Sequence, residues 1–131
     1  MTWTLFVAGG ASRIHPLNDD GLRSSVLSYE TTTNTWLKLT TLNTPRFRAA
    51  MTLHRGDIYV TGGLSSVSAY RYSKDVECWS HESKTWRQIA ATQTTRIGAK
   101  LHIDGQRLFI IGGLSQPAVP GVTSEIEAVQ L

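Results

Sequence analysis

The chain is a series of short apolar segments separated by polar and glycine-rich stretches. Three of these segments end in a glycine pair: "TLFVAGG" at Gly9-Gly10, "DIYVTGG" at Gly62-Gly63 and "RLFIIGG" at Gly112-Gly113. They are rich in β-branched and aromatic residues, which is typical of strands that are buried on both faces. No stretch that is long enough to form a helix has apolar residues at the spacing of an amphipathic helix. The pattern therefore predicts an all-β protein.

A second set of segments predicts β-hairpins. "VLSYET" and "VECWSH" begin with an apolar residue and carry an aromatic residue at the fourth position, Tyr29 and Trp79. "TWLKLT" and "TWRQIA" follow them and alternate from Trp36 and Trp86, as half-buried strands do. The polar residues in between, "NT" and "SKT", are typical of tight turns.

These segments form an internal repeat. A shift of 50 residues places Trp36 on Trp86, Glu77 on Glu127, and one "GGLS" phrase on the other. The first two glycine pairs are 53 residues apart, so the loop after Gly10 is expected to hold three extra residues. About four strands in roughly 50 residues is the size of one β-propeller blade.

One stretch fits the repeat better at a shift of 48 residues. "RAAMTLH" from Arg48 matches "RIGAKLH" from Arg96, which predicts two compensating two-residue insertions. This match makes Arg48 equivalent to Arg96, and His54 equivalent to His102. Insertions of this kind are tolerated best in surface loops.

In all these features the chain resembles the kelch-repeat family of β-propellers. The family pattern is an apolar strand, a glycine pair, a variable loop, an aromatic residue and a tryptophan seven positions later. Tyr29 with Trp36 and Trp79 with Trp86 keep that spacing. The stretches around them are most similar to the kelch-like adaptor proteins, in which a BTB domain precedes the propeller. The last unit departs from the pattern, because Val129 stands where the aromatic residue should be.

The resemblance implies a partial kelch β-propeller of about two and a half four-stranded antiparallel blades. With the strands of a blade lettered a to d, residues 1–45 form a partial blade (b, c, d), 46–95 a complete blade, and 96–131 a partial blade (a, b, c). Each blade of a propeller buries its faces against its neighbours. We therefore expect the chain to be a fragment of a larger propeller, with self-assembly of two or three copies as the alternative.

The composition is that of a folded protein, with 40% hydrophobic and 18% charged residues in 131. The net charge is +3, but the 13 lysines and arginines are scattered, so we predict no nucleic-acid binding. The single cysteine, Cys78, is consistent with a reducing compartment. The sequence shows no leader and no membrane-spanning run, so we expect no membrane association and a cytoplasmic location, with the nucleus as the alternative.

No catalytic residue, metal or cofactor is predicted. The glycine pairs lack the spacing of nucleotide-binding loops and are better explained as strand ends that need positive φ and close backbone approach. The histidines, His15, His54, His81 and His102, do not pair at metal-binding spacings. Cys78 is expected to be an inert strand residue. Because galactose oxidase is a copper enzyme with a kelch-type propeller, a fragment of a carbohydrate-active or oxidase-type propeller stays open as an alternative.

Candidate binding residues lie in the loops. In kelch-like adaptors the b–c loops and the loops from strand d to the next strand a form a ligand-facing rim. The resemblance thus implies that Arg48 and Arg96, with Arg46 as a third candidate, grip an acidic peptide motif through bidentate hydrogen bonds. The equally weighted alternative is that these arginines brace neighbouring blades or are solvated in the loop.

The b–c loops at 11–25, 64–74 and 114–124 differ in sequence while the strands around them repeat. The second loop offers Tyr70, Arg71 and Tyr72, residue types that are enriched at interaction hot spots. The repeated aromatic residues, Tyr29, Trp36, Trp79 and Trp86, are instead expected to pack between blades.

The resemblance therefore implies a non-catalytic protein-interaction module. It would be part of the substrate-recognition propeller of a kelch-like ubiquitin-ligase adaptor and would bind a protein partner through its rim loops. A BTB domain and a cullin scaffold are expected only in the full-length parent. An actin- or cytoskeleton-binding kelch protein is the alternative within the same class.

Overall fold

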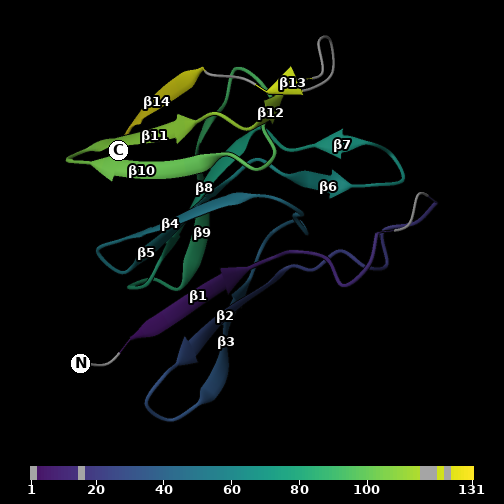
Figure 1. Cartoon of the computed structure of the whole chain (residues 1–131). Coiled ribbons are helices and arrows are strands. Elements are labelled where there is room, and N and C mark those ends of the chain that lie inside the picture. The colour runs from purple at the N-terminus through teal and green to yellow at the C-terminus, as the bar shows by residue number, and fades with distance from the viewer. Residues whose placement is uncertain (1–2, 15–16, 116–120, 123–124) are drawn as a thin grey trace.

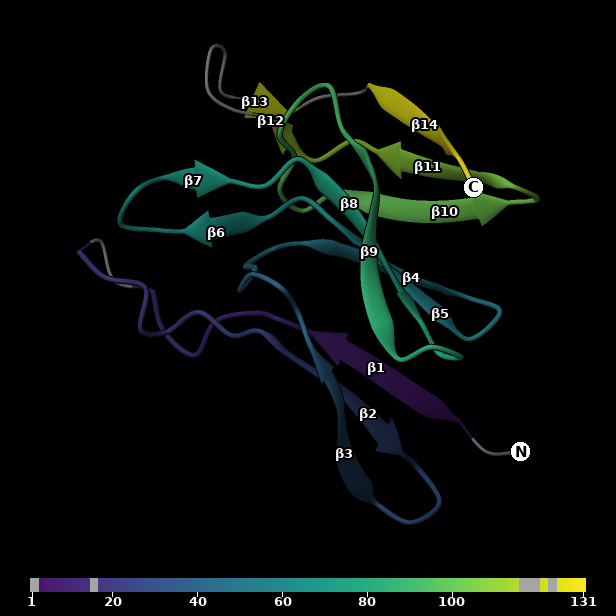
Figure 2. The ribbon, with the colours of Figure 1, turned by 180° about the vertical axis from the view of Figure 1, so that it is seen from behind.

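The computed structural model describes residues 3–14, 17–115, 121–122 and 125–131. Over these residues the chain is built of antiparallel sheets and contains no helix, so no described segment is a helix that could cross a membrane. Three sheets stand face to face, with the four-stranded sheet between the two three-stranded ones (Figures 1 and 2). The predicted all-β, partial-propeller fold is confirmed.

The strands occur in the predicted blade order. Blade 1 is the sheet β1 (Thr4–Ala8), β2 (Ser25–Glu30), β3 (Thr35–Thr41). Blade 2 is the sheet β4 (Ala50–His54), β5 (Asp57–Thr61), β8 (Asp75–Ser80), β9 (Thr85–Ala91). Blade 3 is the sheet β10 (Lys100–Asp104), β11 (Arg107–Ile111), β14 (Ile126–Gln130). In the lettering of the repeat these strands are b-c-d, a-b-c-d and a-b-c.

Two small hairpins lie in the b–c loops of blades 2 and 3 and were not predicted. They are β6 (Leu64–Ser66) with β7 (Arg71–Tyr72), and β12 (Leu114–Ser115) with β13 (Gly121–Val122). The rest of the third b–c loop, at 116–120 and 123–124, lies outside the described residues, as does His15. The described parts of the b–c loops and the d–a loops at 42–49 and 92–99 lie at the same end of the blades, which we call the rim (Figure 1).

Blades 2 and 3 are related by a constant shift of 50 residues, so the predicted shift of 48 with two insertions is wrong. His54 pairs with Asp57 at the β4–β5 turn, and Asp104 pairs with Arg107 at the β10–β11 turn. His54 is therefore equivalent to Asp104 rather than to His102. Two turns of equal length fix the strand register, and a chance similarity of short segments cannot override it.

Side chains of β5 alternate between two interfaces. Ile58 and Val60 join Val26, Leu42 and Trp79 in the first interface, between blades 1 and 2. On the other face of the same blade, Tyr59 joins the second interface, between blades 2 and 3; its buried members are Ala50, Tyr59, Val76, Cys78, Ala99, Leu108 and Ile110. The segment "DIYV" is thus buried on both faces, as predicted for a central strand.

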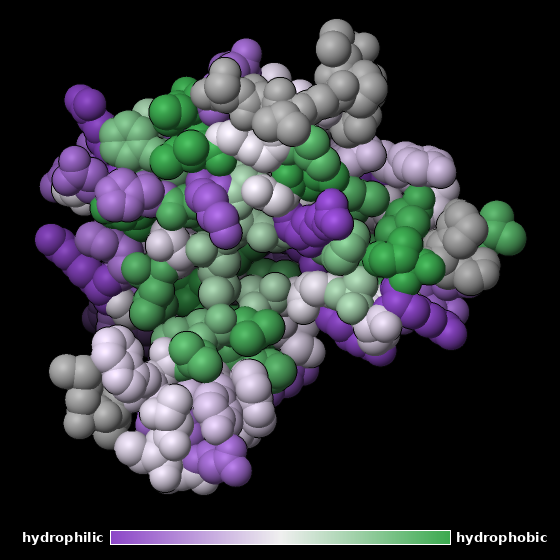
Figure 3. All heavy atoms as spheres, viewed as in Figure 1, coloured by the Kyte–Doolittle hydropathy of each residue, from purple (hydrophilic) through white to green (hydrophobic). Residues whose placement is uncertain are grey.

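The outer faces of blades 1 and 3 expose the corresponding apolar side chains. Leu5 and Val7 take the places that Ile58 and Val60 hold in blade 2, yet Leu5 is 54% exposed. Figure 3 shows apolar side chains gathered over β1. On blade 3 the exposed apolar side chains include Ile126, at 61%, and its strand partner Ile111, at 39%.

The four repeated aromatic residues divide into two groups. Trp79 and Trp86 pack in the first interface. Trp36 is more than half exposed and stacks on Tyr29 of its own blade, with ring centroids 4.8 Å apart. The expectation that Trp36 packs between blades is therefore not met. Trp86, its counterpart, lies on the face of blade 2 that packs on blade 1, and among the described residues no sheet covers the same face of blade 1.

Candidate functional site

Arg46, at the rim, is buried rather than ligand-facing. It is 1% exposed, and its Nη2 lies 3.1 Å from Glu77 Oε1 of β8 in the same blade. Its Nη1 donates to the carbonyl of Gly62 at 2.9 Å. Charges this deeply buried are retained when they are paired and hydrogen-bonded.

Arg96 repeats this arrangement in blade 3. It is also 1% exposed, its Nε donates to Glu127 Oε2 at 2.9 Å, and its Nη1 donates to the carbonyls of Gly112 and Glu125. Arg96 is thus the counterpart of Arg46, not of Arg48. The guanidinium groups of Arg46 and Arg96 lie buried inside the blades, so in this structure they are not exposed to a ligand. These contacts favour the alternative that the two arginines brace the blades.

The backbone carbonyls of these two arginines accept hydrogen bonds from the glycine pairs of the preceding blade. The amide of Gly10 donates to the carbonyl of Arg46 at 2.7 Å, and the amide of Gly63 donates to that of Arg96 at 2.9 Å. A Cβ on Gly62, where φ is +73°, would lie 2.4 Å from the Arg96 carbonyl oxygen. All six residues of the glycine pairs have positive φ: Gly9, Gly10, Gly62, Gly63, Gly112 and Gly113. Each arginine therefore binds its own blade by its side chain and the preceding blade by its carbonyl.

Arg48 is the exposed arginine of the same d–a loop. Its φ is +59°, and the equivalent residue in the next blade is Gly98, with φ +68°. The carbonyl of Arg48 accepts from the amide of Gly98 at 2.9 Å, and its guanidinium lies 5.4 Å from the ring centre of Phe47. A residue with a side chain costs about 1–2 kcal/mol in this conformation. Such strain concentrates at functional sites.

The β6–β7 hairpin presents a second exposed candidate. Tyr70, at the end of its turn, is 70% exposed and has φ +49°. Arg71 beside it is exposed, whereas Tyr72 is half-buried and pairs with Leu64 across the hairpin. Of the three residues selected from this loop, Tyr70 and Arg71 are therefore the ones available to a partner.

A carboxylate that the sequence did not single out holds this hairpin in place. Asp19, in the b–c loop of blade 1, accepts hydrogen bonds from the Val67 amide at 2.7 Å, the Ser68 amide at 3.1 Å and the Ser66 hydroxyl at 2.7 Å. The Ser66 hydroxyl, followed by the Ser68 and Val67 amides, holds the pKa of Asp19 below its usual range. We call these contacts the Asp19 clamp, and they join the rim loops of blades 1 and 2.

Replacing Asp19 by Ala is expected to release the β6–β7 hairpin. Amide exchange at Val67 and Ser68 should accelerate by roughly tenfold or more, because their acceptor is lost. Since folding lowers the pKa of Asp19, the clamp stabilises the protein above the unfolded pKa, and this contribution disappears as the pH falls through the folded pKa. Exchange measured by mass spectrometry at neutral and acidic pH checks both points.

The neighbouring Asp20 gives the control. Its carboxylate lies 3.5 Å from Arg13 Nη2 on the surface. Asp20→Ala should leave exchange at Val67 and Ser68 unchanged. Equal effects of the two substitutions would argue against the clamp.

The described part of the rim is basic. Acidic side chains in or directly beside its loops have partners: Asp19 in the clamp, Asp20 with Arg13, Asp75 as the acceptor of Gln88 Nε2 at 3.1 Å, and Glu125 at 3.9 Å from Arg96 Nη2. Exposed cationic side chains of the rim loops are Arg23, Arg48, Arg71 and Lys74. This distribution favours an acidic ligand.

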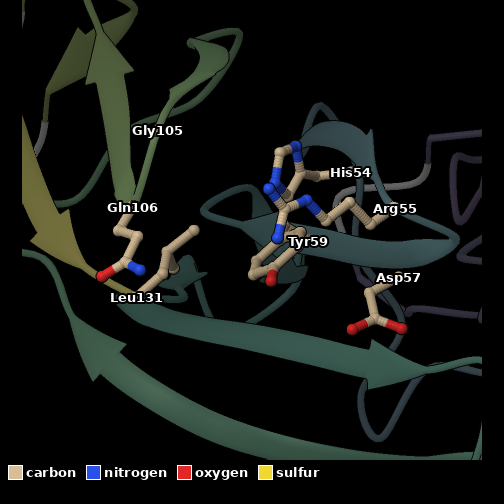
Figure 4. Close-up of a pocket in the computed structure, with 7 residues that line it drawn as sticks. All are labelled: His54, Arg55, Asp57, Tyr59, Gly105, Gln106 and Leu131. Carbon is tan, nitrogen blue, oxygen red and sulfur yellow. The ribbon is translucent and has the colours of Figure 1, made fainter.

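The opposite end of the blades carries a pocket of about 280 Å³ between blades 2 and 3. Figure 4 shows His54, Arg55 and Tyr59 on one side, facing Gln106 and Leu131 on the other. Burial raises the pKa of Tyr59 to about 12, so its hydroxyl stays protonated at neutral pH. Asp57 is paired with His81 at 2.8 Å.

The described residues offer no evident catalytic or metal chemistry. They contain no group of three histidine, cysteine or acidic side chains arranged to hold a metal ion. Cys78 is buried, and burial raises the pKa of its thiol above the usual range. A thiol in that state is a poor nucleophile. The arrangement at the rim is instead suited to binding.

Comparisons with known proteins agree with this architecture. Residues 45–92 match the family model of the Kelch motif. Cowpox virus (strain Brighton Red) Kelch repeat and BTB domain-containing protein 1 is 32% identical over 79 residues, and the camelpox virus (strain CMS) protein of the same name is 31% identical over 80 residues. Each match covers 58% of this chain and 14% of the viral protein, so the chain spans a small part of these relatives.

The fold is also that of a solved structure. The structure of YjhT superposes with a TM-score of 0.70 and 18% identity over 96% of this chain and 48% of that one. At this identity the likeness concerns the fold alone. Together with the sequence matches, it shows that residues 45–92 carry a Kelch motif and that the chain is similar to BTB-kelch proteins and has the fold of part of a β-propeller.

Proposed function

We propose that the chain is a non-catalytic protein-interaction module that binds an acidic segment of a partner at its rim. The observation that carries this proposal is Arg48. Its exposed guanidinium stands on a left-handed residue at a place where the next blade has Gly98. Unlike Arg55, which shares this conformation at the other end of the blades, Arg48 lies among the exposed cationic side chains of the rim, which suit an acidic segment.

The neighbouring hairpin extends the same surface. Tyr70 and Arg71 are a rigid aromatic residue and a planar cation, the types that dominate interaction hot spots. The Asp19 clamp fixes the hairpin before a partner arrives, which lowers the entropy lost on binding.

The relatives' names suggest the larger setting. A protein with both kelch repeats and a BTB domain fits a substrate adaptor of a cullin-type ubiquitin ligase, in the cytoplasm or, alternatively, the nucleus. The propeller would then select the substrate, and the BTB domain would contact the cullin scaffold. Co-precipitation of a cullin with the full-length parent, and its loss when the BTB domain is deleted, tests this assignment.

Arg48→Gly is expected to weaken acidic-peptide binding while stabilising the fold. The loss of a charge-assisted hydrogen bond should raise the Kd for a fluorescein-labelled peptide rich in Glu and Asp by about tenfold. The free energy of unfolding should rise by about 1 kcal/mol, because the left-handed strain is relieved. Fluorescence anisotropy and urea unfolding measure the two effects.

Arg55 provides a matched control at the other end of the blades. It is also exposed, has φ +52°, and corresponds to Gly105 in blade 3. Arg55→Gly should give a similar stabilisation and leave peptide binding unchanged. If both glycine variants weakened binding equally, the peptide would be recognised by overall charge and the rim assignment would fail.

A further inference from the structure

We propose that the tips of the rim loops of blades 1 and 2 bind a phenylalanine side chain within the acidic segment of the partner. The contact residues are Ile14, Leu17 and Tyr70, which we call the tip patch. This inference rests on the function proposed above, and it adds a second kind of contact to that made by Arg48.

The tip patch consists of large apolar side chains that the fold leaves in contact with solvent. Ile14 is 51% exposed, Leu17 81% and Tyr70 70%. They lie on loops, whereas the exposed apolar side chains of β1 and β14 belong to the outer faces of sheets. At the right of Figure 3, where the two loop tips lie, apolar side chains gather with hydrophilic ones beside them. Exposed apolar patches with a polar border are typical of interaction sites.

The loop of blade 1 that carries two of these side chains is held by its own hydrogen bonds. The Ser12 amide donates to the Gly21 carbonyl at 2.8 Å, and the Leu22 amide donates to the Asp19 carbonyl at 3.0 Å. The carbonyl oxygen of Arg13 leaves no room for a Cβ on Gly21, so the two sides of the loop pack directly on each other. A preformed surface of this kind loses little conformational entropy when a ligand binds.

The Asp19 clamp brings Tyr70 to the same place. Asp19 is two residues from Leu17, and its carboxylate accepts from the amides of Val67 and Ser68. The Tyr70 amide donates to the Val67 carbonyl at 3.2 Å in the turn of the β6–β7 hairpin. A short path of covalent and hydrogen bonds therefore connects the two loop tips, and the two loops end side by side (Figures 1 and 2).

The charges near the tip patch favour an acidic segment. Arg71 follows Tyr70 directly and is exposed, and Arg23 is exposed at the base of the other loop. The carboxylates of that loop, Asp19 and Asp20, already have partners. Cations next to apolar side chains are complementary to a ligand in which acidic residues flank an apolar one.

The composition of the tip patch suits an aromatic ring. Two aliphatic side chains and the Tyr70 ring offer a surface on which a flat ring packs, and contacts between aromatic rings are favourable beyond the area that they bury. Phenylalanine makes this contact without a hydroxyl group that must be desolvated. Three side chains are too few to anchor the protein in a lipid surface, for which even a single myristoyl chain is marginal.

The test compares two fluorescein-labelled peptides, EEDFDEE and EEDADEE, by fluorescence anisotropy with the full chain. The phenylalanine peptide should bind with a Kd about tenfold lower, because one aromatic side chain is buried. Leu17→Ser should raise the Kd of the phenylalanine peptide about fivefold and leave that of the alanine peptide unchanged. Leu37→Ser is the matched control, since Leu37 is 58% exposed on β3, outside the rim loops, and it should affect neither peptide.

Tyr70→Asn tests the contribution of the second loop. Asparagine tolerates the positive φ of this position, +49°, so the substitution removes the ring without adding backbone strain. It should weaken binding of the phenylalanine peptide alone. Circular dichroism checks that each variant is folded.

The outcomes separate this inference from the proposed function. Equal Kd values for the two peptides, or equal effects of Leu17→Ser and Leu37→Ser, would overturn the tip patch; if Arg48→Gly still weakened both peptides, the proposed function would stand. Phenylalanine-dependent binding that Arg48→Gly leaves unchanged would support the tip patch and contradict the role of Arg48. Binding to phosphatidylserine vesicles that is lost in Leu17→Ser would assign the patch to a lipid surface and overturn the inference.

Discussion

Replacing Glu77 by alanine is expected to lower the free energy of unfolding by about 3–5 kcal/mol. The substitution leaves the Arg46 guanidinium inside blade 2 without its carboxylate, which lies 3.1 Å from it and is itself buried. Glu77 Oε2 also accepts from Asn43 Nδ2 at 3.3 Å, so the d–a loop loses a second contact. Urea unfolding followed by tryptophan fluorescence measures the change.

The matched experiment removes both charges. Arg46→Met combined with Glu77→Leu should lie within about 1–2 kcal/mol of the parent, because no unpaired charge remains in the interior. Blade 1 already carries an apolar residue, Leu27, at the position of Glu77. If Glu77→Ala alone changed stability by less than about 1 kcal/mol, the ion pair would not be the brace that its geometry indicates.

Gly63→Ala is expected to destabilise the protein far more than the same change at the equivalent glycine, Gly10. Both residues have positive φ, +86° and +99°, so both substitutions introduce about 1–2 kcal/mol of left-handed strain. A Cβ on Gly63 would also lie 2.8 Å from the Phe47 carbonyl oxygen and 3.0 Å from the Ala49 amide nitrogen. At Gly10 nothing lies within 4 Å.

The difference between the two variants therefore isolates the contact with the backbone. We expect Gly63→Ala to be less stable than Gly10→Ala by roughly 2 kcal/mol, the usual size of an overpacking penalty. Thermal and urea unfolding of the two variants side by side provide the measurement. Equal destabilisation would mean that the d–a loop moves aside and that backbone crowding does not explain the second glycine of the pair.

The blade architecture could be predicted because it follows from local rules. Short apolar segments, glycines with positive φ and tight turns each depend on a few neighbouring residues, and the repeat provided several independent copies of each. The alignment went wrong only between Trp36 and the second glycine pair. In that region the similarity of the segments that start at Arg48 and Arg96 indicated a shift of 48 residues, whereas the strand register requires 50.

The buried ion pairs of Arg46 and Arg96 could be predicted only from residues far away in the sequence. Glu77 and Glu127 share the 50-residue shift with Arg46 and Arg96, and this paired recurrence was the available signal for two buried ion pairs. The Asp19 clamp had no such signal. Asp19 contacts the next blade through a loop that occurs once, and its partners include backbone amides that every residue carries.

The double attachment of Arg46 and Arg96 bears on how the molecule unfolds. The backbone carbonyl of each arginine accepts a hydrogen bond from a glycine amide of the preceding blade. Its guanidinium group donates to carbonyl oxygens and to a carboxylate of its own blade. A blade that opens would thus pull on the loop that caps the one before it. Nearest-neighbour coupling of this kind makes the stability of each blade depend on the blade beside it. The middle blade, coupled on both sides, should be the last to exchange its amides.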